Sequence, residues 1–145
     1  MHKSSILIAG LAATALAGAA QAHVVFTQPT ATVGGHWAGA LRVGHGCDGS
    51  ATTSVRVEIP AGIVVARPRV PAGWSVAIER EALDEPVRAE GGGLLTERIS
   101  AITWTGRLPD EQFEEFGLAA KTARHVGTAG LSGRPDVRTG RGSLD

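Results

Sequence analysis

One histidine lies where two of its nitrogen atoms can chelate a metal ion. Residues 1–22 have the pattern of a secretory signal peptide, with Lys3 near the start, then an apolar stretch, then Ala20-Gln21-Ala22, after which signal peptidase would cut. Cleavage there makes His23 the first mature residue and frees its α-amino group. This amine and the imidazole Nδ1 can close one chelate ring, and flat nitrogen coordination is typical of Cu(II). We predict a metal site at His23; the alternative is that a histidine follows the cleavage site by chance.

Four carboxylates close together in the sequence form the second group that can bind a metal. They are Asp110, Glu111, Glu114 and Glu115. A carboxylate supplies an oxygen ligand and neutralises one charge of Cu(II), so one of them would complement the nitrogen chelate. The alternative for such a cluster is a solvated turn followed by the exposed face of a strand, and this is the role we expect for Glu114 and Glu115.

Two further histidines and one cysteine have side chains that can bind metals. His45 and Cys47 are two positions apart and could form a second site for Cu(I) or zinc, but two ligands at this spacing are a weak signal. We expect surface or loop positions for His36 and His45. Cys47 is the single cysteine of a chain exported to an oxidising compartment. We expect an unpaired half-cystine rather than a nucleophile, because no catalytic signature accompanies it.

The length and net charge of the chain favour a single domain whose main partner is neither nucleic acid nor an anionic membrane. Removal of the signal peptide leaves about 123 residues, the size of one domain with one core. The formal net charge is zero, which argues against nucleic acid or an anionic membrane as the main partner. No segment of the mature chain approaches the roughly 20 apolar residues needed to span a bilayer. We therefore expect a periplasmic or secreted protein with no membrane span.

The elements that must position these residues read as β-strands. Polar and apolar residues alternate in Ser54–Ile59 and Trp74–Glu79, which is typical of strands with one exposed face. Turn residues recur every 8–12 residues or so, as in a β-sandwich or barrel. The spacing of apolar residues between Leu108 and Ala120 also suits a short helix, which leaves that segment open. The predicted strands are Val24–Thr27, Ala38–Val43, Thr52–Ile59, Val64–Arg67, Trp74–Arg80, Arg98–Trp104 and Phe113–Ala119.

The end of the chain has a different composition. Residues 122–145 are rich in glycine and arginine, contain no aromatic residue, and follow neither the strand nor the helix period. Such a segment cannot bury enough apolar surface to order itself, so we expect a disordered tail. Two origins remain open: a genuine flexible tail, and a reading-frame change in the source gene.

Five short motifs follow one another in order along the mature chain. They lie at His23–Pro29, Ile59–Ile63, Val70–Val76, Ile102–Trp104 and Leu108–Phe116. Each motif alone is weak, since a proline-glycine turn before a strand is common. Together, and with a histidine at the cleavage site, they make the chain resemble the YcnI family of secreted copper-binding domains.

The resemblance implies an Ig-like or cupredoxin-like β-sandwich that holds Cu(II) in a mono-histidine brace. The brace consists of the amine and Nδ1 of His23 and a carboxylate just before the Phe113-x-x-Phe116 strand. That carboxylate is Asp110 or Glu111, with Asp110 as the first choice. The resemblance also implies a tryptophan near the copper, further along the chain. Family members that share the Gly44-His45-Gly46-Cys47 type of segment carry that tryptophan and a second cysteine in their last strands. Neither residue occurs here after position 121, which favours a truncated or frameshifted C-terminus.

The sequence therefore predicts an exported copper-binding protein that is not an enzyme and serves copper trafficking or storage. Its expected partners are the copper ion and another copper protein of the envelope. The expected organisation is a signal peptide (1–22), an all-β copper-binding sandwich (23–121) and the tail (122–145). Two other classes stay open: a metal-free extracytoplasmic interaction domain, and a copper monooxygenase, which would need a second histidine in the brace.

Overall fold

The computed structural model describes residues 24–46 and 49–124 and the backbone of residues 135–139. These residues form eight β-strands. The strands are β1 (Val24–Phe26), β2 (His36–Val43), β3 (Thr52–Glu58), β4 (Ile63–Pro68), β5 (Ser75–Arg88), β6 (Leu94–Leu108), β7 (Glu114–Thr122) and β8 (Pro135–Thr139). Within these ranges no helix is long and apolar enough to cross a membrane.

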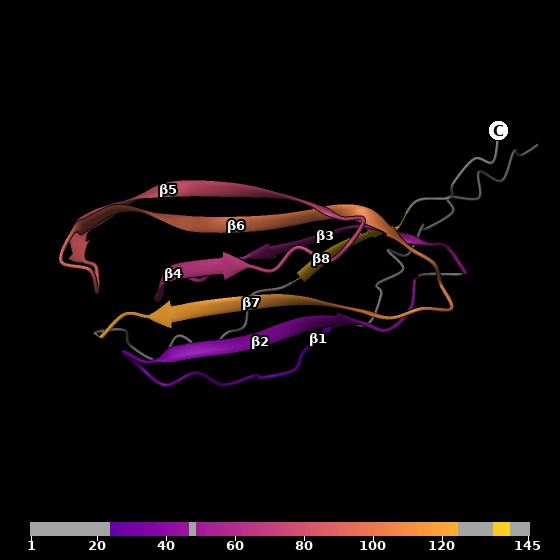
Figure 1. The fold of residues 1–145 in the computed structure, drawn as a ribbon, viewed down its shortest axis with the longest axis horizontal. Helices are drawn as coiled ribbons and strands as arrows, with labels where there is room; N and C mark the ends of the chain where they lie inside the picture. The colour runs from indigo at the N-terminus through magenta and orange to yellow at the C-terminus, as the bar shows by residue number, and fades with distance from the viewer. Residues whose placement is uncertain (1–23, 47–48, 125–134, 140–145) are drawn as a thin grey trace, which may run out of the picture.

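The strands form two four-stranded antiparallel sheets that pack as a sandwich (Figure 1). The first sheet has the order β1-β2-β7-β4 and the second has the order β5-β6-β3-β8. Because the side chains of a strand alternate between its two faces, each sheet turns one apolar face toward the other. The predicted all-β sandwich is confirmed.

Aromatic side chains from both sheets fill the space between them. Trp104 of β6 and Phe116 of β7 are fully buried, with ring centroids 5.5 Å apart. Trp74 packs edge-on against Phe116 at 4.7 Å. The indole nitrogens donate to backbone oxygens, from Trp104 to Arg69 and from Trp37 to Gln28. All three tryptophans therefore pack in or against the core, and Trp37 lies within β2.

The hairpin of β5 and β6 is longer than the sequence pattern indicates. Strands were predicted at Trp74–Arg80 and Arg98–Trp104, but pairing continues to Arg88 on β5 and starts at Leu94 on β6. Most side chains of β5 are exposed, so its outer half carries no alternating apolar signal. Cross-strand backbone hydrogen bonds hold it instead, and these do not depend on side-chain type.

The segment that suited either a strand or a helix forms β7, which pairs with β2 on one side and β4 on the other. Two sets of cross-strand hydrogen bonds outweigh the weak helical spacing. Within the segment expected to be disordered, Pro135–Thr139 form β8, which pairs with β3. That pairing uses backbone groups and needs no apolar pattern. The rest of the expected tail beyond Arg124 lies outside the described residues.

Candidate metal site

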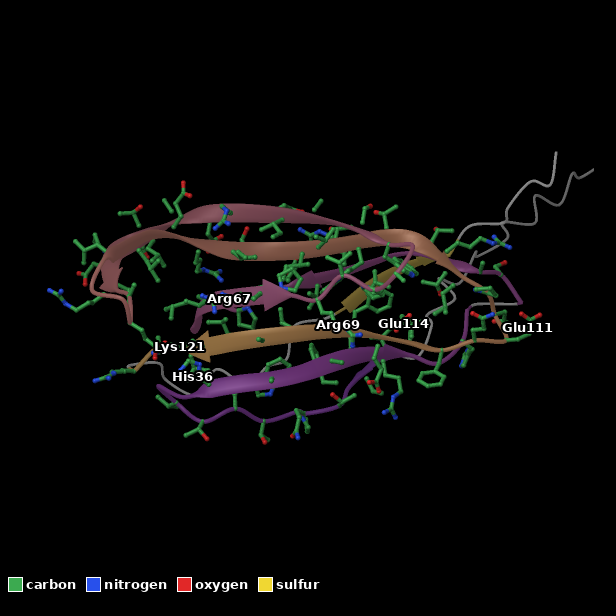
Figure 2. All side chains as sticks on the ribbon, in the orientation of Figure 1. His36, Arg67, Arg69, Glu111, Glu114 and Lys121 are labelled. Atoms are coloured by element: carbon green, nitrogen blue, oxygen red, sulfur yellow. The ribbon has the colours of Figure 1, made fainter. Side chains whose placement is uncertain are left out.

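The register of the first sheet places the start of β1 at the same end of the sandwich as the turn between β6 and β7. Val24 lies opposite Val43 of β2, and Val43 lies opposite Glu114 at the start of β7. Neighbouring strands are about 4.8 Å apart, so Val24 and Glu114 are separated by about 10 Å. The turn 109–113 directly precedes Glu114, and Figure 2 shows Glu111 at the tip of this end, with Glu114 further toward the middle.

Asp110 is held in this turn by a backbone contact from a distant loop. The amide of Gly46 donates to Asp110 Oδ1 at 2.9 Å, and the Asp110 side chain is half-buried. Within the turn, the amide of Gln112 donates to the carbonyl of Pro109 at 3.1 Å. Among the described residues no donor reaches Asp110 Oδ2. The carboxylate is therefore oriented through one oxygen by the Gly46 amide.

Gly46 lies so close to the backbone of Ser50 that no side chain fits at this position. A Cβ atom at this position would lie 1.7 Å from the carbonyl oxygen of Ser50. Only glycine permits such an approach of two backbone segments. Gly46 was not among the predicted site residues, although its place between His45 and Cys47 was a signal in the sequence.

The other acidic residues of the cluster differ in their contacts. Glu111 is exposed and has no ion pair in the described part of the chain. Glu115 faces outward and forms an ion pair with Arg42 at 2.6 Å. The half-buried Glu114 accepts a hydrogen bond from the amide of Glu115 at 2.9 Å. Asp110 and Glu111 thus share one turn, and the expected surface role holds for Glu115 more fully than for Glu114.

The two described histidines lie at opposite ends of the sandwich, and two other candidate ligands lie outside the described part of the chain. His23 and Cys47 lie outside the described residues. His45 is exposed near the turn, with its Nδ1 2.7 Å from the carbonyl oxygen of Gly46. His36 lies at the opposite end, as Figure 2 shows, where its Nε2 is 3.1 Å from Glu90. Among the described side chains, no three His, Cys, Asp or Glu residues are grouped as a metal site.

At that opposite end, Glu90 connects the two sheets: it lies in the turn between β5 and β6 of the second sheet and contacts two residues of the first sheet. Its carboxylate contacts Lys121 of β7 and His36 of β2. The hydrogen bond from Lys121, and then the one from His36, lower the pKa of Glu90 below its ordinary value. All three residues belong to a surface network far from Asp110, so His36 is not brought to the candidate site.

Comparison with known proteins identifies the fold and the family. A crystal structure of an uncharacterized protein from Nocardia farcinica, described as having an immunoglobulin-like fold, is 20% identical, with a TM-score of 0.53 over 85% of this chain and 91% of that chain. This likeness shows an Ig-like fold. No curated protein matches the sequence. The model of a family described as a domain of unknown function (DUF1775) matches residues 23–130, beginning at the predicted first mature residue. YcnI-like proteins are members of that family, so the resemblance is confirmed at this level, and the chain belongs to the DUF1775 family.

Proposed function

We propose that this protein binds one Cu(II) ion at its mature N-terminus through the α-amine and Nδ1 of His23 and a carboxylate oxygen of Asp110. The observation that supports this most directly is the register from Val24 through Val43 to Glu114. It puts the beginning of β1 and the acidic turn at one end of the same sheet.

Two features of the chain support placing the proposed ligands in one site. His23 is bonded to Val24, so their Cα atoms are 3.8 Å apart. Asp110 contacts Gly46, which follows Val43, the partner of Val24, by three residues. These contacts support one site formed by the mature N-terminus and the turn.

Asp110 fits the role of a copper ligand better than Glu111. The Gly46 amide orients the Asp110 carboxylate, so less conformational entropy is lost when a metal binds. Glu111 is exposed and its side chain has to be ordered by the metal itself. Between the two carboxylates that the sequence left open, the fixed one is our choice.

The proposed donor set suits exchange of copper rather than permanent burial. Two nitrogens and one oxygen leave coordination positions open to water or to a ligand of a partner protein. The amine must lose its proton to bind, and a free α-amine has a pKa of about 7.7–8.0. Affinity for Cu(II) should therefore fall as the pH drops below this range. We propose trafficking or storage of copper after export to the periplasm or the exterior.

Copper titration of two mature forms tests the proposal. One form begins with His23 and the other carries a single alanine before it, which turns the amine into an amide. We expect the extension to weaken Cu(II) binding by at least about tenfold, or about 1.4 kcal/mol. His36→Ala is the matched control, because His36 lies at the opposite end and its loss should leave affinity unchanged.

Two results would overturn the proposal. Equal affinity of the two mature forms would exclude the amine as a ligand. If the copper-loaded protein consumed oxygen with a reductant faster than the same amount of free copper, the protein would be a monooxygenase and not a copper carrier.

A further inference from the structure

On the outer face of the first sheet, two exposed arginines lie beside a row of small side chains. This row, which we call the shelf, consists of Ala38 and Ala119. Arg67 of β4 lies next to Ala119 of β7, which in turn lies next to Ala38 of β2. Arg69, just beyond β4, donates its amide to the carbonyl of Gly117 on β7. We call Arg67 and Arg69 with this shelf the arginine face. Figure 2 shows both arginines over the middle of the molecule, between its two ends.

The charges on this side of the sheet are not balanced. Among the described residues, its carboxylates already have cationic partners: Glu115 pairs with Arg42, and Glu90 reaches in from the hairpin tip to pair with Lys121. Arg67 and Arg69 are exposed, and neither forms an ion pair within the described part of the chain. The formal net charge of zero therefore conceals a local surplus of two positive charges.

The side chain of Arg69 packs against the surface of the sheet. A Cβ atom added to Gly117 would lie 3.2 Å from Arg69 Cβ and 3.4 Å from its Cδ. The aliphatic stem thus lies against the glycine backbone, which has no side chain to lift it. A stem held in this way loses less rotamer entropy when its guanidinium binds a partner.

We infer that the arginine face is a docking surface for an acidic, extended segment of a partner protein. Arg67 and Arg69 are two residues apart on one edge of the sheet, which corresponds to about 6.6–6.8 Å along a strand. Carboxylates at alternate positions of an extended chain have the same spacing. Each guanidinium can bind a carboxylate through two parallel hydrogen bonds, and the shelf lets a backbone approach closely.

The inference does not depend on copper binding, but the two sites lie on the same sheet. Four strands span about 14 Å, whereas a standard interface covers about 800 Å² on each partner. A protein docked on β4 and β7 would therefore extend over β1, where the chain enters the fold. This arrangement suits a partner that also needs access to the N-terminus.

The arginines of β5 provide a matched control. Arg80 and Arg88 are exposed like Arg67 and Arg69, but they share their strand with acidic residues. These acidic residues are Glu79, Glu81, Asp84 and Glu85. The double change Arg80→Glu and Arg88→Glu alters the net charge as much as Arg67→Glu with Arg69→Glu, on a different surface.

Fluorescence anisotropy with a labelled decapeptide of alternating Glu and Thr tests the inference, with the Lys and Thr analogue as a charge control. We expect the acidic peptide to bind the native protein at low salt and the basic one not to bind. The R67E/R69E variant should lose at least about tenfold in affinity, and R80E/R88E less than about twofold. Circular dichroism melts check that both variants fold, and NMR shifts should map the peptide onto β4 and β7.

Several outcomes would overturn the inference. Equal losses in both double variants would show nonspecific charge attraction. Binding of phosphatidylglycerol vesicles without binding of the acidic peptide would assign the face to a membrane. Self-association in sedimentation that disappears in R67E/R69E would assign it to a second copy of the chain.

Discussion

At each end of the sandwich a carboxylate contacts a distant part of the chain, but the two carboxylates have different kinds of partner. At one end, half-buried Asp110 accepts a hydrogen bond from the backbone of Gly46. At the other end, exposed Glu90 pairs with Lys121 and His36 at the surface. The first contact joins a side chain to the backbone, and the second joins exposed side chains to one another.

This difference supports the Asp110 end as the place of the proposed metal site. A backbone amide beside a tightly folded loop holds its partner in one geometry, as a ligand set requires. Exposed ion pairs contribute little because solvent and salt screen them. The exposed pair of Glu90 and His36 is therefore weaker support for a metal site than the oriented carboxylate of Asp110.

The largest expected effect comes from adding a methyl group to the loop at the Asp110 end. Gly46→Ala would place a carbon 1.7 Å from the Ser50 carbonyl, so backbone must shift. We expect a loss of more than about 2 kcal/mol in the free energy of unfolding. Gly91→Ala at the other end meets no atom within 4 Å and should change stability by less than about 0.5 kcal/mol. Urea denaturation measures both, and equal values would contradict the contrast.

A smaller effect should separate the two carboxylates of the turn. Asp110→Asn keeps an oxygen for the Gly46 amide but removes the charge, so Cu(II) affinity should fall by about tenfold with little change in stability. Glu111→Gln removes the same charge one residue away and should change affinity by less than about twofold. Isothermal titration of both variants decides between them, and the reverse order would make Glu111 the ligand.

The smallest effect belongs to the opposite end. Because its partners lower the pKa of Glu90, the ionised carboxylate stabilises the folded state. This stabilisation is present above the ordinary glutamate pKa of 4.5 and is lost as the pH falls through the lower folded value. Glu90→Gln should therefore lower the melting temperature slightly at pH 7 and low salt. The difference should vanish in high salt or at strongly acidic pH, and its persistence in both would contradict a surface ion pair.

Much of the sandwich could be predicted because its strands carry local signals. The alternation in Ser54–Ile59 and the turn glycines gave β3 and its boundaries to within a residue or two. Trp104 and Phe116 lie in segments that were predicted to be strands, and both are fully buried. Asp110 and Glu111 were found as candidates from their type and position, and the structure places both in one turn.

The parts that could not be predicted depend on residues far apart in the chain. Gly46 and Asp110 are separated by 64 positions, and no local pattern reveals that one holds the other. The outer half of β5 and the short strand β8 are paired through backbone groups, which leave no mark on side-chain type.

By itself, the sequence determined the all-β class and a candidate ligand set of His23 with Asp110 or Glu111. The tertiary structure alone decided that His36 lies away from the acidic turn, that Gly46 orients Asp110, and that Arg67 and Arg69 stand without carboxylate partners on one face of the described fold. The physical reason is that hydrophobic periodicity is encoded by neighbouring residues, whereas strand register and charge distribution arise only when distant segments pair.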